Sequence, residues 1–252
     1  MPRSLVVLVP PSEAKSFGGS HGHDPGVFDS VLDEARLEVR NGLRALLAHG
    51  STSELSRVLG VRGPLLARAR DATSALVEGV AATMPAWRRY SGVVWTHLDP
   101  VSLHVAQRRR LLIPSGLYGL NGGDDPIADY RLKMSVRVEP LGHLGSFWRE
   151  RATSALVERL KGAIVINLLP KEYAASVDLT ALAGSCDLRH VTFRDRRSGV
   201  AVGHEAKAVK GRFARHALKS GADDLGAFHW EGWRVSTVGC ASDHLTIERD
   251  RS

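Results

Sequence analysis

Residues 5–15 read LVVLVPPSEAK, and they predict a buried strand with polar residues at its end. The apolar residues at the start of this stretch are mostly branched, and they stop at a pair of prolines. Such a run is typical of a strand covered on both faces and ended by a turn. Ser12, Glu13 and Lys15 follow the prolines. We therefore expect these three side chains at one edge of a sheet, where functional groups often lie.

The rest of the chain mixes helical and extended patterns. Helices are predicted at Val27–His49, Ser53–Leu59, Pro64–Arg70, Thr73–Thr83, Phe147–Leu160 and Ala206–Lys219. Strands are predicted at Gly92–Trp95, Leu111–Ile113, Ala163–Leu168, Trp233–Val238 and Leu245–Glu248, with a hairpin formed by Val191–Arg194 and Gly199–Val202. Because the pattern lacks a clean βαβ alternation, we expect an α+β or mixed α/β fold. No repeat or linker divides the sequence, which predicts a single domain over residues 1–252.

Composition narrows the functional classes. The chain has 252 residues, 43% hydrophobic and 24% charged, as in ordinary globular proteins. Its formal net charge of +7 favours a polyanionic partner, although a solvated basic surface has the same composition. Two cysteines without a CxxC motif, and no apolar run long enough to span a bilayer, predict a cytoplasmic protein without membrane association. We expect a monomer.

Metal and cofactor sites are not predicted. The sequence contains 11 histidines, but they form neither an HExxH motif nor a pair spaced four residues apart on a helix. The two cysteines are far apart, and a zinc site would need further ligands at regular spacing. We therefore expect no bound metal and no cofactor.

Lys15 and a glycine-flanked segment are the first candidates for ligand binding. Lys15 could bind a phosphate or, if desolvated, act as a reactive amine; alternatively, Ser12 simply caps a helix. Further on, glycines follow a predicted strand in SGLYGL at 115–120, where free amides can form an anion site. Tyr118 and Tyr130 could stack on a base, and Arg131 could bind phosphate. A structural turn with a core tyrosine explains the same residues.

A basic segment near the carboxyl end is the third candidate. Gly203–His216 is rich in cations, and helical spacing places Lys207 and Lys210 on one side while Val209 and Phe213 face the core. The cations are not balanced by nearby acids, which favours anion binding over an ordinary solvated face.

The fourth candidate resembles a helix–hairpin–helix and covers about residues 53–70. Two short helices surround Gly60-Val61-Arg62-Gly63-Pro64, and Arg62 and Arg68 add charge. Such elements hold the DNA backbone through turn amides and cations without reading the base sequence. The usual hairpin lacks the extra residue that Arg62 supplies here, and an αα-corner has the same pattern.

Several segments, in their order along the chain, resemble the YaaA family of peroxide-stress proteins (DUF328, UPF0246). They are LVPPSEAK, PAWRRYSGVVWTHLD at 85–99, PSGLYGLNGGDDPIADYRLKM at 114–134, FWRE at 147–150, INLLPKEY at 166–173 and GHEAKAVKGRFAR at 203–215. The resemblance implies one mixed α/β domain of unusual topology. It also implies a cytosolic role in hydrogen-peroxide resistance through lower free iron, with DNA bound by a helix–hairpin–helix and a basic cleft.

The resemblance further implies which residues line that cleft: Lys15, Tyr118, Tyr130, Arg131, Lys207, Lys210 and Arg212. The chain departs from the family pattern at Trp95-Thr96-His97, at Asn121-Gly122-Gly123 and at Leu169-Pro170. If those positions lie in the cleft, they predict a diverged member with its own ligand.

Three functions therefore remain open. The first is a stress-response protein that binds DNA without sequence specificity and limits iron-driven damage. The second is an enzyme for a small phosphorylated or nucleoside-like molecule, in which Lys15 or Lys207 supplies the amine and His204 or Glu13 moves the proton. The third, an iron-sequestering protein, has the least support, because the sequence lacks a set of carboxylates and histidines at ligand spacing.

Overall fold

A computed structural model of the chain describes residues 3–21, 25–195, 203–236 and 243–249. Its helices are α1 Asp29–His49, α2 Thr52–Leu59, α3 Pro64–Glu78, α4 Ala86–Arg89, α5 Val93–Leu98, α6 Val105–Arg108, α7 Leu144–Arg159, α8 Lys171–Ala174, α9 Leu179–Ala183 and α10 Gly203–Ser220. Two 3₁₀ turns are η1 Pro100–Ser102 and η2 Leu225–Ala227. The strands are β1 Leu5–Leu8, β2 Thr83–Pro85, β3 Leu111–Ser115, β4 Gly119–Gly122, β5 Pro126–Ala128, β6 Arg137–Val138, β7 Gly142–His143, β8 Ile164–Asn167, β9 Asp187–Asp195, β10 His229–Trp230, β11 Trp233–Val235 and β12 His244–Arg249.

One mixed sheet organises the molecule. Its eight strands lie in the order β10-β11-β12-β9-β8-β1-β3-β4. The five from β12 to β3 are parallel to their neighbours, and the outer pairs β3–β4, β11–β12 and β10–β11 are antiparallel. Two small antiparallel pairs, β2–β5 and β6–β7, lie outside this sheet. The predicted mixed α/β fold is therefore confirmed.

The apolar run near the start of the chain forms the central strand. β1 pairs with β8 on one side and with β3 on the other, and all four of its residues are buried. Strands covered on both faces need apolar side chains at every position, which explains why the run does not alternate. Beyond β1, the indole N–H of Trp95 donates to the carbonyl of Pro10 at 3.1 Å. This bond fixes the chain where it leaves the sheet toward Ser12.

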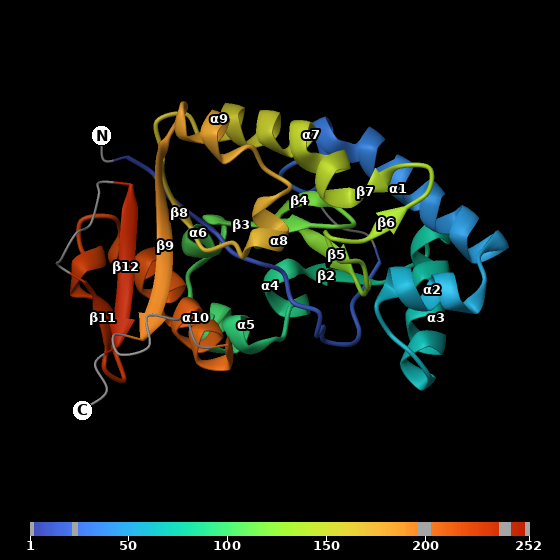
Figure 1. Ribbon diagram of the computed structural model, residues 1–252, viewed down its shortest axis with the longest axis horizontal. Coiled ribbons are helices and arrows are strands. Elements are labelled where there is room, and N and C mark those ends of the chain that lie inside the picture. Colours follow the sequence, from blue (N-terminus) through green and yellow to red (C-terminus); the bar gives the residue numbers. More distant parts are fainter. Residues whose placement is uncertain (1–2, 22–24, 196–202, 237–242, 250–252) are drawn as a thin grey trace.

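Helices cover the sheet on both sides. In Figure 1, α9, α7 and α1 run along one side, and α10, α5 and α4 lie along the other. The pair α2–α3 lies at the end of the molecule away from β11 and β12. α10 packs closely against α5, since a Cβ added at Gly211 would overlap the carbonyl oxygen of Val94. Val209 and Phe213 are fully buried on that helix, as its spacing predicts.

Several predicted elements differ from the structure. Gly92–Trp95 was expected to be a strand, but Val93–Leu98 is helix α5. The two helices expected between residues 64 and 83 are one helix, α3, which ends at Gly79 in the left-handed conformation. Ser12 does not begin a helix; the chain bends at Glu13 and Ala14, and Lys15 then forms an isolated β-bridge with Tyr90. The second strand of the expected hairpin, 199–202, lies outside the described residues.

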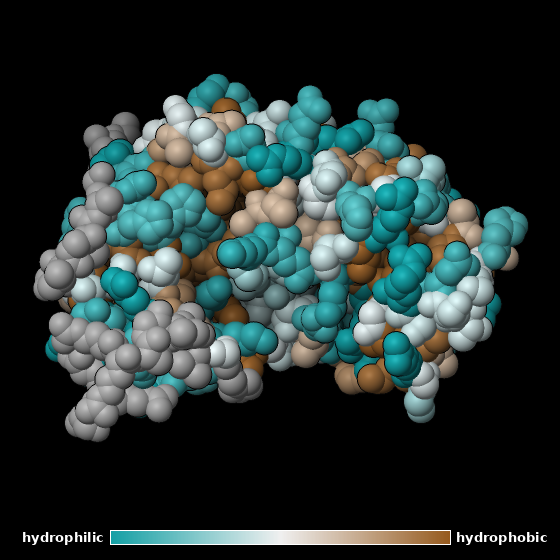
Figure 2. All heavy atoms as spheres, viewed as in Figure 1, coloured by the Kyte–Doolittle hydropathy of each residue, from teal (hydrophilic) through white to brown (hydrophobic). Residues whose placement is uncertain are grey.

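The surface is mostly polar. On the face in Figure 2, hydrophilic residues cover much of the area, and hydrophobic ones show mainly in the hollows between them. Within the described ranges, no helix is both long enough and apolar enough to cross a bilayer. The expected single domain over residues 1–252 stays a prediction, as does the expected monomer.

Candidate functional site

A small recess gathers several of the predicted site residues, and we call it the Lys15 recess. Ser12, Lys15, Tyr130 and Arg131 line it, as the sequence predicts. The other lining residues are Pro11, Glu13, Leu59, Gly60, Leu132, Lys133 and Tyr173. Its interior volume is about 20 Å³, which is room for about one water-sized group. A ligand would therefore place a single polar group here rather than its whole body.

Lys15 is held firmly in this recess. Its ammonium donates to the carbonyl of Ser12 at 2.8 Å and lies 4.0 Å from the centre of the Tyr130 ring. Burial is the main cause that lowers the pKa of Lys15 to about 7; the carboxylate of Asp129 opposes this shift, and the positive charge of Arg131 adds to it. An amine with this pKa is partly neutral at physiological pH. It can bind an anion as a cation or react as a nucleophile.

Tyr130 supports Lys15 through a buried network of hydroxyl groups. Its hydroxyl lies 2.8 Å from that of Tyr90 and 2.8 Å from that of Ser115. The Ser115 oxygen also accepts the backbone N–H groups of Leu117 and Tyr118. Burial raises the pKa of Tyr130 far above its usual range, so the phenol stays neutral. The neutral ring then offers its face to the ammonium.

Carboxylates balance part of the charge around the recess. Asp129 pairs with Arg68 at 3.0 Å, and Glu13 pairs with Lys133 at 2.8 Å. The guanidinium of Arg68 also lies 3.7 Å from the centre of the exposed Phe17 ring. Arg131 adds an unbalanced positive charge beside Lys15, since no ion pair to it is formed within the described residues. The recess is therefore suited to a single negative group.

The α2–α3 element borders the same recess. Leu59, the last residue of α2, and Gly60, in the left-handed conformation, both line it. Arg62 follows in the turn and is exposed, and Gly63 precedes the first turn of α3. The structure thus joins two segments that the sequence singled out separately. That the element is a DNA-binding helix–hairpin–helix stays a prediction.

The basic helix α10 stands apart from the recess. Lys207 is exposed, and burial lowers the pKa of Lys210 to about 8, helped by the charge of Lys207. The guanidinium of Arg212 lies 5.7 Å from the centre of the Trp230 ring. In the part of the chain that the structure describes, none of these three residues lines the recess. The side chain of His204 lies outside the described residues.

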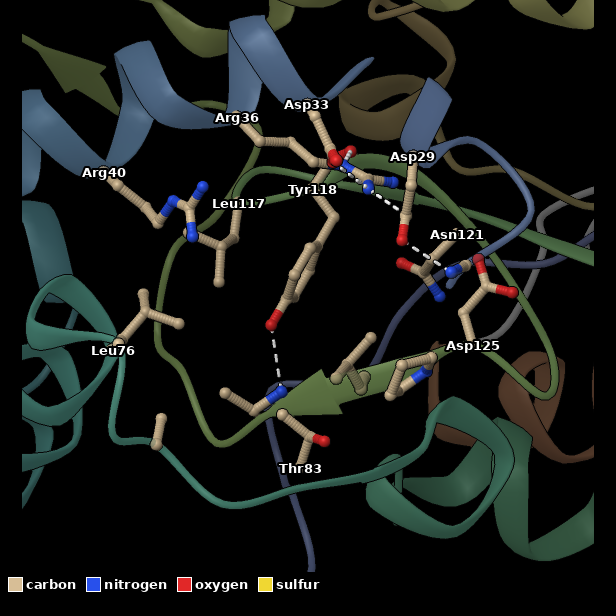
Figure 3. Close-up of a pocket in the computed structure, with 16 residues that line it drawn as sticks. Asp29, Asp33, Arg36, Arg40, Leu76, Thr83, Leu117, Tyr118, Asn121 and Asp125 are labelled. Atoms are coloured by element: carbon tan, nitrogen blue, oxygen red, sulfur yellow. Dashed lines mark hydrogen bonds and ion pairs between the residues drawn. The ribbon is translucent and has the colours of Figure 1, made fainter. Parts of the chain in front are cut away.

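Tyr118 lies in a neighbouring cavity rather than in the recess. Its ring meets that of Tyr130 edge to face, with centres 5.7 Å apart, so the two rings form a shared wall. The cavity beyond this wall has a volume of about 240 Å³ and is lined by α1, α3 and the β4–β5 region. Figure 3 shows Tyr118 crossing it, with the hydroxyl near the backbone N–H of Ala128. We call it the α1 cavity.

Sequence reasoning missed several of these residues. Lys133 and Tyr173 reach the recess from segments that were quoted only for their family resemblance. In the α1 cavity, Arg40, Thr83 and Asn121 come from three distant parts of the chain. Only Asn121 carried a signal, because it departs from the family pattern.

The other two departures do not change the recess directly. Trp95 is buried in the core, and the ring of His97 packs against Trp230 with centres 5.5 Å apart. Leu169 donates its N–H to the side chain of Asn167, and Pro170 precedes the short helix α8 that carries Tyr173. Over the described ranges, no group of three or more His, Cys, Asp or Glu is placed to hold a metal ion.

Comparisons with known proteins identify relatives of this chain. The profile of the family described as "Peroxide stress protein YaaA" matches residues 5–238. A UPF0246 protein of Streptomyces coelicolor is 33% identical, over 86% of this chain and 84% of its own length. UPF0246 proteins of a Ruegeria species and of Flavobacterium johnsoniae are 31% and 32% identical, over 91% and 97% of this chain. The match over residues 5–238 and the identity to these relatives over most of the chain show that the chain belongs to the peroxide stress protein YaaA family.

Proposed function

We propose that this protein acts in the peroxide-stress response by binding the DNA backbone without sequence specificity. The observation that carries the proposal is the Lys15 recess, which joins Lys15, Arg131 and the α2–α3 turn around a space for one negative group. A recess of about 20 Å³ suits one phosphate oxygen of an extended polymer better than a whole small molecule. Protein bound along the backbone would limit iron-driven damage at the sites it covers.

The charge distribution extends the proposed surface beyond the recess. Arg62 is exposed in the adjoining turn, and Lys207 is exposed on α10. The chain as a whole carries a formal charge of +7. Each phosphate that these cations neutralise releases counterions, so binding should weaken steeply with salt.

A salt titration of DNA binding tests the proposal. For three or four phosphate contacts, log affinity should fall against log salt with a slope of about −3 for duplex DNA, whatever its sequence. Arg131→Ala and Arg62→Ala should each reduce that slope by about one. Lys219→Ala, an exposed cation at the far end of α10, serves as the matched control and should change little. A flat salt response, or equal losses in all three variants, would overturn the proposal.

A second candidate function is favoured by the lowered pKa of Lys15. A partly neutral amine beside Arg131 could form an imine with a phosphorylated carbonyl compound, releasing water, which fits an enzyme for a small phosphorylated or nucleoside-like substrate. In that reading Lys207, His204 and Glu13 are the further candidates for phosphate binding and proton transfer.

Trapping with pyridoxal phosphate and borohydride tests this candidate. At pH 7, borohydride reduction should fix the label on Lys15 well before exposed lysines such as Lys219, and peptide mass spectrometry would locate it. Equal labelling of both lysines would remove the basis for an amine-dependent enzyme. It would leave the DNA proposal to be judged by the salt titration.

A further inference from the structure

The α1 cavity has polar groups that the fold leaves unused. Among the described residues, Asn121 Oδ1, Thr83 Oγ1 and Arg40 Nε are buried without a hydrogen-bond partner. All three residues line the cavity, and Asn121 is only 1% exposed. A buried polar atom without a partner destabilises the fold, so three around one cavity call for an explanation. A ligand that satisfies them is the explanation that the geometry favours.

Arg36 and Asp125 are already engaged by other groups of the protein, which leaves the atoms without partners as the recognition groups. Arg36 is fully engaged: it pairs with Asp29, pairs with Asp33 at 3.0 Å, and donates to the carbonyls of Tyr118 and Leu120. Asp125 accepts the N–H of Gly122 at 2.7 Å, and burial raises the pKa of its carboxyl group. The carboxyl groups of Asp29, Asp33 and Asp125 line the cavity and disfavour an anionic ligand, so a neutral ligand fits best.

The distribution of donors and acceptors indicates the ligand's chemistry. In Figure 3, Asn121 and Asp125 lie on one side of the cavity, and Arg40 lies on the opposite side near Leu117 and Leu76. The first side offers acceptor oxygens and therefore suits N–H groups of a ligand. The second offers the N–H donor of Arg40 and suits a ring nitrogen or a carbonyl.

The walls of the cavity between these two sides suit a planar ligand. The Tyr118 ring crosses the cavity, and Leu76, Leu117 and Ile127 provide apolar surface around it. Aromatic and aliphatic walls of this kind stabilise planar rings by offset or edge contacts. The volume of about 240 Å³ is below the range for drug-sized ligands, so one or two fused rings are the appropriate size.

We propose that the α1 cavity binds an amino-substituted aromatic heterocycle of the nucleobase type. Its amino N–H groups face Asn121, and its ring acceptor faces Arg40. Thr83 Oγ1 forms a weaker hydrogen bond with the edge of the heterocycle. The site is separated from the Lys15 recess by the rings of Tyr118 and Tyr130, and it does not depend on DNA binding.

Calorimetric titration of the purified full-length protein tests this site. Adenine and cytosine should bind, and 6-dimethylaminopurine, which lacks the amino N–H, should bind about tenfold more weakly. Adenosine distinguishes the source of the base: binding as tight as that of adenine indicates a nucleoside, and much weaker binding indicates the free base. Asn121→Leu, of similar shape, should weaken adenine about tenfold and leave 6-dimethylaminopurine unchanged.

Further variants keep the test decisive if Asn121→Leu fails to fold. Thr83→Val should weaken adenine by a few-fold, and Arg131→Ala, outside the cavity, should leave its affinity unchanged. Failure of adenine and cytosine to bind the folded protein at millimolar concentration would overturn the proposal. So would equal affinity for adenine and its dimethylated analogue, because that result would show that the amino N–H groups are not recognised.

Discussion

Burial lowers the pKa of both Lys15 and Lys210, yet the surroundings of the two ammonium groups differ. Lys15 donates to a backbone carbonyl, lies on the Tyr130 ring and has the carboxylates of Asp129 and Glu13 within electrostatic range. The ammonium of Lys210 lies 5.8 Å from the centre of the Phe193 ring, and the charge that acts on it is the like charge of Lys207. Desolvation is the largest cause of the lowered pKa in both cases.

The difference shows that a lowered pKa by itself does not identify a site. The recess around Lys15 is built from four distant segments that place donors, acceptors and an aromatic face around one small space. Lys210 belongs to a helix that packs on α5, and its lowered pKa follows from burial and from the like charge of Lys207. The recess is therefore the stronger candidate for chemistry, and α10 is the stronger candidate for stability.

The largest effect expected of one substitution at a fixed pH concerns that structural role of α10. Gly211→Ala should destabilise the protein by about 1–3 kcal/mol, because the added Cβ would overlap the carbonyl of Val94 and lie 2.8 Å from the amide nitrogen of Leu98. Alanine in an unobstructed helix normally stabilises by about 0.5–1 kcal/mol, so the sign is opposite to propensity. Chemical denaturation followed by circular dichroism measures the change.

Gly203→Ala is the matched control on the same helix. Around an added Cβ at Gly203, the described structure has no atom within 4 Å, so stability should change little or increase. Equal destabilisation by both substitutions would mean that the close contact between α10 and α5 at Gly211 is not the cause of the lost stability.

The next effect separates the two lysines by pH. Each has a folded-state pKa below its ordinary value of 10.5, about 7 for Lys15 and about 8 for Lys210. Between the folded and unfolded pKa values, the unfolded chain binds more protons, so the free energy of unfolding rises with pH. Lys15 contributes this rise from about pH 7 to 10.5, and Lys210 contributes it from about pH 8.

Lys15→Met and Lys210→Met test these windows. Within its own pH window, each variant should lose up to about 1.4 kcal/mol per pH unit from the rise of the free energy of unfolding with pH. Urea unfolding from pH 6 to 10 should therefore show a flatter profile for each variant than for the unchanged protein, with the flattening beginning at lower pH in Lys15→Met than in Lys210→Met. If neither substitution flattens the profile, the ammonium groups are not desolvated as described.

Much of the fold could be predicted because its main elements have strong periodicity. The central strand and the long helices α1, α7 and α10 lie where apolar spacing places them. Helix α5 could not be predicted, since Val93, Val94 and Trp95 favour a strand locally. The contact with Gly211 of α10 shows that tertiary packing decides the conformation of this segment, and that contact joins residues more than a hundred positions apart.

The candidate site was predictable only in part. Ser12, Lys15, Tyr130 and Arg131 follow strands or glycines, and that position made them visible in the sequence. Tyr173 approaches from a short helix that no local pattern connects to Lys15. The α1 cavity was harder still to predict, because Arg40 lies on a regular helix, where its sequence pattern is that of an ordinary surface cation.

The smallest expected effect tests whether Asp129 acts on Lys15 in the recess. Asp129 pairs with Arg68 at 3.0 Å, and both side chains are partly exposed. Arg68→Ala removes this partner, so the carboxylate acts more strongly on Lys15 and should raise its pKa by a few tenths of a unit. NMR titration of the lysine Cε signals, with Lys15 assigned by its loss in Lys15→Met, measures the shift. Arg70→Ala, an exposed cation two residues along α3, should leave the Lys15 signal unchanged. A lowered pKa in Arg68→Ala would show that the ion pair orients Asp129 toward Lys15, and the charge balance of the recess would then depend on Arg68.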